Sequence, residues 1–197
     1  MKYSLNGIIY RNIIDPILSQ YYPRISEDLK PGDTVLDVAC GTGSLSLAMA
    51  ALASRVKGID LSEEMIGIAN DQAERKKVDN LEFEIRDASD LSSIGDNQFN
   101  VAVTSMAIHQ FDAELALQIL KEMKRIAPKV IIMDYNYPME PGMSKLVIFT
   151  IERIAGGDHY RNFRRFNELG GLDYFTEQAG LRIECEKLRK NSAFRVV

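Results

Sequence analysis

The sequence is short of the residues that mark several classes of protein. Only two of its 197 residues are cysteine, Cys40 and Cys185, and they lie far apart in no CxxC or metal-ligand spacing. We therefore expect no disulfide framework, no metal site and a reducing, cytoplasmic location. No apolar run approaches the roughly 18 residues that span a bilayer, and no signal-peptide pattern follows Met1, so we expect no membrane span.

Basic residues are not in excess either. The chain has 24 Lys and Arg against 28 Asp and Glu, a net charge of −4, and so has no overall field that would favour nucleic acid. Its apolar content of 46% and charged content of 26% are typical of a soluble globular protein. The length suits one domain over residues 1–197, as a monomer or homodimer.

The order of apolar segments predicts an α/β fold. Strand-like runs alternate with helical stretches such as Ser44–Ser54 and Ala113–Ile126, which implies right-handed crossovers and a parallel sheet. Two more strands are expected at Leu181–Leu188 and Ala193–Val197, and their short connection makes an antiparallel hairpin. We expect a Rossmann-like, seven-stranded, mostly parallel sheet with helices on both faces. The five earlier runs are Thr34–Val38, Val56–Ile59, Leu81–Ile85, Val101–Thr104 and Val130–Met133.

One turn carries most of the functional information. Asp37 lies near the end of the first strand-like run, and Gly41 and Gly43 follow before a helical stretch begins. In an α/β protein such a turn usually binds a nucleotide-like ligand. A P-loop is excluded because Ser44, and not lysine, follows Gly43. A dinucleotide is disfavoured because Ser46 replaces the third glycine and Asp37 would repel a pyrophosphate.

A ligand with a cationic centre and no phosphate meets both objections, and two later acids fit it. Asp60 ends the second strand-like run, where a carboxylate can accept hydrogen bonds from both hydroxyls of a ribose. Asp87 and Ala88 follow the third run, where the acid can receive the exocyclic amine of an adenine. The pattern describes an adenosine with a positively charged substituent.

These motifs resemble those of the class I S-adenosylmethionine-dependent methyltransferases, of the branch that includes the ubiquinone- and menaquinone-type, or type 11, small-molecule enzymes. The resemblance covers about residues 33–135 in the right order. It consists of the first motif at Asp37–Gly43, the acid Asp60, the pair Asp87-Ala88 and the fourth-strand segment Phe99–His109. It implies that S-adenosyl-L-methionine is the cofactor and that a small molecule accepts the methyl group.

The resemblance also implies roles for single residues. Gly41 and Gly43 would let the backbone approach the methionine part, while Asp37 faces its amino group. Leu61 and Met65 would flank the adenine, and Cys40 is expected to be a small neutral filler. The full set of expected cofactor-binding residues is Asp37, Ala39, Cys40, Gly41, Gly43, Asp60, Leu61, Met65, Asp87, Ala88, Ser105 and Met106.

The two histidines of the chain are candidate catalytic residues, together with Tyr160. His109 follows the fourth strand-like run, where a base could reach an acceptor; the alternative is a structural histidine before the helix cap Asp112. His159 and Tyr160 lie in residues 156–170, within an expected substrate-side insertion at 136–170. The alternative there is an amphipathic helix whose aromatic residues belong to the core, and whose arginines are solvated.

Two other interpretations remain open beside the enzyme. The chain could be a non-catalytic protein that binds S-adenosylmethionine or S-adenosylhomocysteine, or a nicotinamide-dependent oxidoreductase, which shares the fold. Residues 1–30 are expected to form a helical cap, and in related enzymes such a helix closes over the cofactor. Its expected contacts are Tyr3, Tyr10 and Arg11.

Overall fold

The computed structural model describes residue 12, residues 14–188 and residues 193–197. Tyr3, Tyr10 and Arg11 of the expected cap lie outside the described residues, as does the turn of the predicted hairpin at residues 189–192. The chain divides into two compact units. The first comprises Met1–Thr104 and Arg125–Ile131, and the second comprises Ser105–Lys124 and Ile132–Val197.

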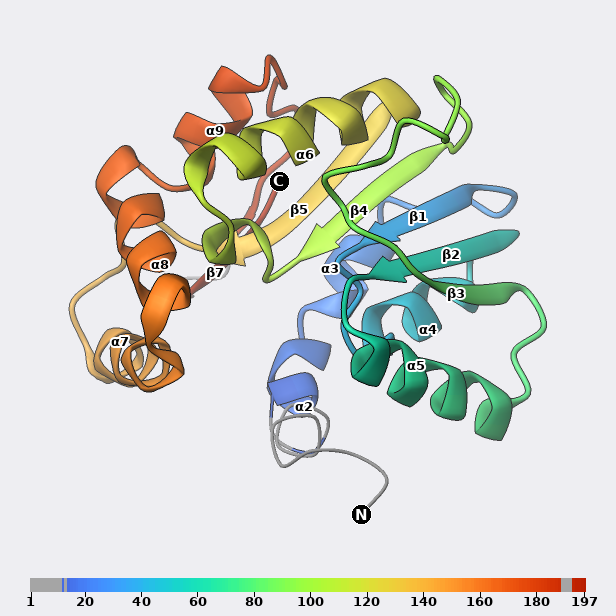
Figure 1. The fold of residues 1–197 in the computed structure, drawn as a ribbon, viewed down its shortest axis with the longest axis horizontal. Coiled ribbons are helices and arrows are strands. Elements are labelled where there is room, and N and C mark those ends of the chain that lie inside the picture. Colours follow the sequence, from blue (N-terminus) through green and yellow to red (C-terminus); the bar gives the residue numbers. More distant parts are fainter. Residues whose placement is uncertain (1–11, 13, 189–192) are drawn as a thin grey trace. The chain divides into compact units, whose positions relative to one another are not determined.

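The first unit holds the parallel strands (Figure 1). β1 pairs in parallel with both β2 and β4, and β2 pairs in parallel with β3. In Figure 1, α4 and α5 lie together on one side of β2 and β3, which they contact. The elements of this unit are α2 (Asp15–Ser19), α3 (Tyr22–Ser26), β1 (Thr34–Val38), α4 (Ser44–Ala50), β2 (Arg55–Asp60), α5 (Glu63–Lys76), β3 (Leu81–Ile85) and most of β4 (Val101–Ser105).

The sequence explains these elements locally. β1 is flanked by strands on both sides, and its side chains Val35, Leu36 and Val38 are fully buried, as expected for a central parallel strand. α5 begins where the Ser62 side chain accepts a hydrogen bond from the backbone N–H of Met65. Helix α4 is shorter than expected, because the chain turns after Ala50 and does not continue to Ser54.

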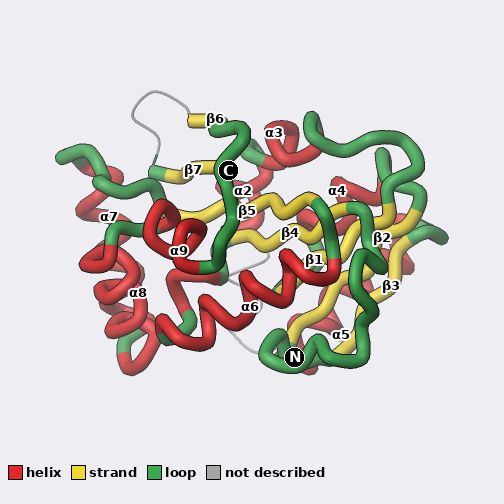
Figure 2. The backbone as a smooth tube through the Cα atoms, turned by 90° about the horizontal axis from the view of Figure 1, so that it is seen from above, coloured by secondary structure: helices red, strands yellow, loops and turns green. Residues whose placement is uncertain are grey.

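The second unit contains most of the remaining helices and the antiparallel strands. α7 and α8 lie side by side in Figure 1 and in Figure 2, and Gly156 both ends α7 and begins α8. β7 pairs antiparallel with β5 and with β6. The elements are η2 (Ile108–Gln110), α6 (Ala113–Ile126), β5 (Lys129–Tyr135), α7 (Met143–Ala155), α8 (Gly157–Leu169), α9 (Leu172–Gln178), β6 (Lys187–Leu188) and β7 (Phe194–Val196), with the end of α6 and the start of β5 assigned to the first unit.

The strand order is β3-β2-β1-β4-β5-β7-β6, which confirms the Rossmann-like α/β fold with an antiparallel C-terminal part. The hairpin is much shorter than expected, because residues 181–186 are not strand. Exposed charged side chains such as Arg182 and Glu184 alternate there with half-exposed ones, so little apolar surface is available to hold a longer strand. The expected placement of helices on both faces stays a prediction.

In the part of the chain that the structure describes, no helix has both the length and the apolar character needed to cross a membrane.

Candidate functional site

The turn between β1 and α4 has a left-handed backbone that glycine adopts most easily. Ala39, Gly41 and Gly43 all have positive φ angles, of 57°, 53° and 74°. For Ala39 this conformation is strained by about 1–2 kcal/mol, because its Cβ approaches the following carbonyl oxygen. Strained residues of this kind cluster at ligand-binding turns. The strained turn coincides with the segment in which the sequence predicts the cofactor loop.

The two glycines of the turn have different surroundings. A Cβ atom at Gly41 would have no heavy atom within 4 Å, so the turn is open on this side. A Cβ atom at Gly43 would lie 2.4 Å from Cζ of Phe83 and 2.8 Å from Cβ of Ala69. Gly43 is therefore needed for packing, and the space for an approaching ligand lies at Gly41.

Asp60, at the end of β2, holds the turn because its side-chain carboxylate accepts hydrogen bonds from backbone N–H groups. Its Oδ2 accepts a hydrogen bond from the N–H of Gly41 at 2.8 Å, and its Oδ1 accepts one from the N–H of Ser62 at 2.9 Å. Each carboxylate oxygen keeps a further lone pair for a ligand. The acid predicted to bind ribose is thus fixed beside the open glycine.

Asp37 is a buried carboxyl group, 1% exposed, within β1. Burial raises the pKa of Asp37 to about 7, against a hydrogen bond from Ser46 that lowers it, and the charge of Asp60 adds to the rise. The Ser46 hydroxyl donates to Oδ2 at 2.5 Å. In the sequence, Ser46 is notable only because it replaces the third glycine of a dinucleotide-binding turn. In the structure it is a direct hydrogen-bond partner of Asp37. A cationic group beside this carboxyl would favour its ionised form.

Cys40 is the remaining titratable group of the turn. Burial, with the charges of Asp37 and Asp60, raises the pKa of the Cys40 thiol well above its ordinary value. The thiol therefore stays protonated and unreactive at neutral pH. This agrees with the expectation that Cys40 is a small neutral filler.

An acid from the N-terminal helical region, which was not predicted from the sequence, also contacts the turn. Asp15, at the start of α2, accepts hydrogen bonds on Oδ2 from the hydroxyls of Thr42 at 2.5 Å and Ser44 at 2.7 Å. Thr42 is 1% exposed, so this is a buried contact. Only the hydroxyl residues after Gly41 could have suggested a distant acceptor.

The residues expected around the adenine lie at the carboxyl ends of β2 and β3. Leu61 is 69% exposed and Ile85, the register partner of Asp60, is 52% exposed. These apolar side chains offer a surface suited to a flat aromatic ring. Met65 is half-buried, the exposed Asp87 accepts a hydrogen bond from the N–H of Ser89 at 2.8 Å, and Ala88 is buried.

Ser105 and Met106 follow in the second unit. Met106 is buried, has a φ of 56°, and donates its N–H to the carbonyl of Met133 at 2.8 Å. This is the second strained non-glycine residue at the end of a strand, after Ala39. The part of Ser105 and Met106 in the cofactor site stays a prediction.

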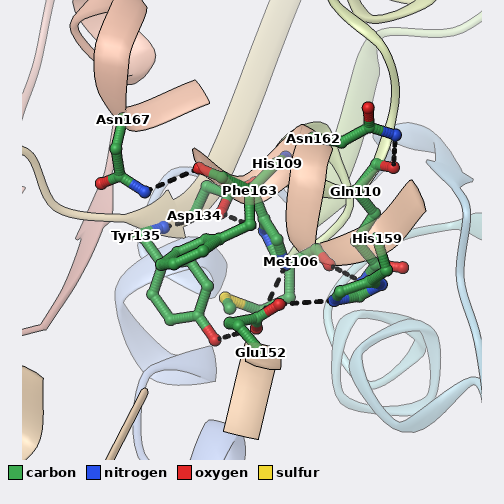
Figure 3. A network of polar contacts seen from close by, with 10 residues as sticks. All are labelled: Met106, His109, Gln110, Asp134, Tyr135, Glu152, His159, Asn162, Phe163 and Asn167. Carbon is green, nitrogen blue, oxygen red and sulfur yellow. Dashed lines mark hydrogen bonds and ion pairs between the residues drawn. The ribbon is translucent and has the colours of Figure 1, made fainter. Parts of the chain in front are cut away.

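The two histidines meet in the second unit, together with a glutamate (Figure 3). His109, 1% exposed, has its Nδ1 2.6 Å from Oδ1 of Asp134 and its Nε2 3.6 Å from Oε1 of Glu152. His159 has its Nε2 2.5 Å from Oε2 of Glu152. The Tyr135 hydroxyl donates to Oε1 of Glu152 at 2.7 Å.

The acids and the histidines of this cluster favour each other's charged forms. Burial lowers the pKa of His109, but the charge and hydrogen bond of Asp134 and the charge of Glu152 outweigh it, so the net shift is upward. Burial raises the pKa of Glu152, but His159, His109 and Tyr135 outweigh it, so the net shift is downward. Neither Asp134 nor Glu152 was predicted from the sequence as part of this cluster. An acid within the largely apolar stretch of α7 was the available signal for Glu152.

Residues 157–169 form the amphipathic helix that was the alternative to a cover over the substrate. Phe163 and Phe166 are 0% and 1% exposed. The half-buried Tyr160 stacks on Phe163, with 6.5 Å between the centroids of the two rings. The arginines of the segment are exposed. The helix α8 begins from Gly156 without a side-chain cap.

Comparison with known proteins agrees with the geometry of the turn. Residues 35–129 match the family model of a methyltransferase domain. The ribosomal protein L11 methyltransferase of Thermotoga maritima is 35% identical over 121 residues, which cover 61% of this chain and 42% of that protein. The ubiquinone biosynthesis O-methyltransferase of Xanthomonas axonopodis pv. citri is 28% identical over 179 residues, which cover 87% of this chain and 71% of that protein.

The fold is also found in solved structures. A protein of Pyrococcus horikoshii OT3 has a TM-score of 0.70 at 23% identity, over 94% of this chain and 89% of that one.

The chain spans about half the length of several curated relatives that it matches. Residues 35–129 are therefore similar to a methyltransferase domain.

Proposed function

We propose that the chain transfers the methyl group of S-adenosylmethionine to a small-molecule acceptor. The observation that carries the proposal is the turn at residues 39–43, which is open at Gly41 and has Asp60 fixed beside it. When bound, S-adenosylmethionine supplies an electrophilic methyl group on a sulfonium whose leaving thioether is neutral. The protein's task is then to align the reactants and to exclude water.

The residues of the first unit suit the chemical groups of this cofactor. Asp37 would face the amino group of the methionine part, and that cation would offset the burial of its carboxyl group. Asp60 would accept hydrogen bonds from the ribose hydroxyls with its free lone pairs. Leu61, with Met65 and Ala88, would contact the adenine, and Asp87 would read its edge.

A small-molecule acceptor is supported by the extent of the similarity. The match to the ubiquinone biosynthesis enzyme extends over 87% of this chain, whereas the match to the ribosomal protein methyltransferase extends over 61%. The longer match reaches further beyond the cofactor-binding motifs. For an acceptor that must lose a proton, His109, His159 and Tyr160 stay the predicted acid–base groups.

The cofactor part is tested by isothermal titration with S-adenosylhomocysteine. We expect Asp60→Ala to weaken binding at least about tenfold, because hydrogen bonds to a charged group contribute about 1.5–3 kcal/mol each. Asp79→Ala is the matched control, since Asp79 is an exposed acid of the same unit. Equal affinities of the Asp60 and Asp79 variants would contradict the ribose assignment.

The transfer itself is tested by a screen with labelled S-adenosylmethionine. Quinols, phenols, amines and carboxylic acids are offered as small acceptors, and ribosomal proteins are offered as the competing class. Methylation of a small acceptor supports the proposal. Methylation of proteins alone would move the chain to the other acceptor class, and tight cofactor binding with no methylation in either arm would support the non-catalytic alternative.

A further inference from the structure

Three side chains from three elements of the second unit converge on one point (Figure 3). His109 comes from η2, Glu152 from α7 and His159 from α8. One nitrogen or oxygen atom of each lies within 4.8 Å of the others. Two imidazoles and a carboxylate are a donor set that proteins use to bind Zn²⁺ or Fe²⁺.

The imidazole of His109 is oriented for coordination. Asp134, 0% exposed, accepts hydrogen bonds from the backbone N–H of His109 at 3.2 Å and of Tyr135 at 2.7 Å. With the Asp134 carboxylate held in this way, Nδ1–H of His109 donates to it at 2.6 Å. The lone pair of His109 is then on Nε2, which faces Glu152. A carboxylate behind a histidine in this manner is the usual support of a metal-bound imidazole.

The two carboxylates of the cluster need a compensating positive charge. Asp134 and Glu152 are both buried, and among the described residues neither carboxylate pairs with a lysine or an arginine. Buried anions are costly unless a positive charge compensates them. The compensation comes either from protons on the two imidazoles or from a metal ion between them.

The distances and the local backbone suit a metal ion. In a tetrahedral zinc site, bonds of about 2.0–2.2 Å place the ligand atoms roughly 3.3 Å apart. The 3.6 Å from Nε2 of His109 to Oε1 of Glu152 is close to that value. The 2.5 Å contact from Nε2 of His159 to Oε2 of Glu152 is a hydrogen bond, and it would lengthen by about 0.8 Å when a metal ion replaces the proton. Gly156 and Gly157, with φ of 69° and 52°, let α8 begin directly after α7, which brings His159 back to Glu152.

We propose that His109, Glu152 and His159 form a binding site for one divalent transition-metal ion, Zn²⁺ or Fe²⁺, with Asp134 as a positioning residue. Three protein ligands leave at least one coordination position for water or for an oxygen or nitrogen atom of a small molecule. The His159 side chain is 31% exposed, so this position is open on its side. The inference goes beyond the proposed methyl transfer and does not depend on it. When the metal ion is bound, the lone pairs of the two imidazoles are used for coordination, so the acid–base role predicted for His109 and His159 applies only to the metal-free protein.

The test uses the full chain without a histidine tag, after treatment with a chelator. Because the chain has only two histidines, imidazole coordination can come only from these positions. We expect Co²⁺ to bind with one ion per chain and to give the visible absorption of a low-symmetry site, Zn²⁺ to displace it, and Mg²⁺ to leave it unchanged. Asp134→Asn should weaken binding about 10- to 100-fold, as loss of a supporting carboxylate does.

His159→Gln is the decisive variant, because its side chain is partly exposed and its loss should leave the fold intact. We expect it to weaken Co²⁺ binding by at least about 100-fold, more than loss of the supporting carboxylate. Thermal unfolding of the metal-free variant checks the fold, and Cys185→Ser, which removes an exposed soft ligand, should bind Co²⁺ as the parent protein does.

Two results of the binding experiments would overturn the site. One is a parent protein that binds neither Co²⁺ nor Zn²⁺ at millimolar concentration. The other is equal binding by the parent protein and His159→Gln. Nitrogen NMR of the two imidazoles gives an independent readout: rings that keep both protons when Zn²⁺ is added would show that protons, not a metal ion, compensate the carboxylates.

Discussion

At the scale of single residues, two glycines of the same turn serve different needs. Gly41→Ala adds a methyl group in open space, so its cost to stability should be only the left-handed backbone, about 1–2 kcal/mol. Gly43→Ala should cost about 1–3 kcal/mol more, because its Cβ would overlap the ring of Phe83. Urea unfolding measures the difference between the two variants.

The same pair separates stability from ligand binding. Gly41→Ala should weaken S-adenosylhomocysteine binding more than its stability loss would suggest, since the added methyl group occupies the space of the ligand. If Gly41→Ala binds as tightly as the parent protein in a titration at a temperature where both are folded, the ligand does not approach the turn at this glycine.

Asp37 predicts a dependence of stability on pH. Its pKa is about 7 in the folded protein against an ordinary value of 3.8, so between these values the unfolded chain has lost a proton that the folded chain keeps. Relative to Asp37→Asn, the free energy of unfolding of the parent protein should therefore fall as pH rises from about 4 to about 7. Parallel pH profiles of the two proteins in urea unfolding would show that Asp37 ionises at its ordinary pKa.

At the scale of elements, the ring of Phe83 links β3 to β2 and to the turn. A Cβ at Gly58 would lie 2.5 Å from Cδ1 of this ring, as one at Gly43 would lie 2.4 Å from Cζ. The aromatic residue of an edge strand thus fills the space left by two glycines of the neighbouring segments. The sequence predicts β3 and the turn separately, and only the structure shows that one ring couples them.

A double-mutant cycle tests this coupling. Gly58→Ala should destabilise the protein by about 1–3 kcal/mol, and less when Phe83 is already leucine, because the shorter side chain removes the overlap with the ring and leaves only the one with Sγ of Cys40 at 2.9 Å. Gly95→Ala is the matched control, since its nearest heavy atom would lie at an ordinary 3.6 Å. Additive losses in the cycle would contradict a contact between residues 58 and 83.

The parts that the sequence predicts well are those with local signals. The strands β1 and β3 and the helix α6 have the expected bounds, because their apolar patterns are local. Long-range contacts are different. Asp15 reaches the turn from 27 residues away and Asp134 reaches His109 from 25, and no spacing in the sequence indicates such partners.

At the scale of the whole molecule, ligand binding should shift the thermal unfolding of the chain. S-adenosylhomocysteine at 100 times its Kd should add about 2.7 kcal/mol of stability. For a protein of this size each kcal/mol corresponds to about 2–4 °C, so we expect a rise of about 5–10 °C. Calorimetry measures it, with NAD as the control ligand, which should give no shift. An equal shift with NAD would contradict the adenosyl-sulfonium assignment of the turn.

The hydrogen bonds of Asp15 to Thr42 and Ser44 bear on how the protein can be shortened for study. The family match begins at residue 35, yet the hydroxyls that follow Gly41 have their acceptor on α2. A recombinant fragment cut at the start of β1 would leave the buried hydroxyl of Thr42 without that acceptor. The smallest fragment fit for crystallisation with cofactor must therefore begin ahead of α2.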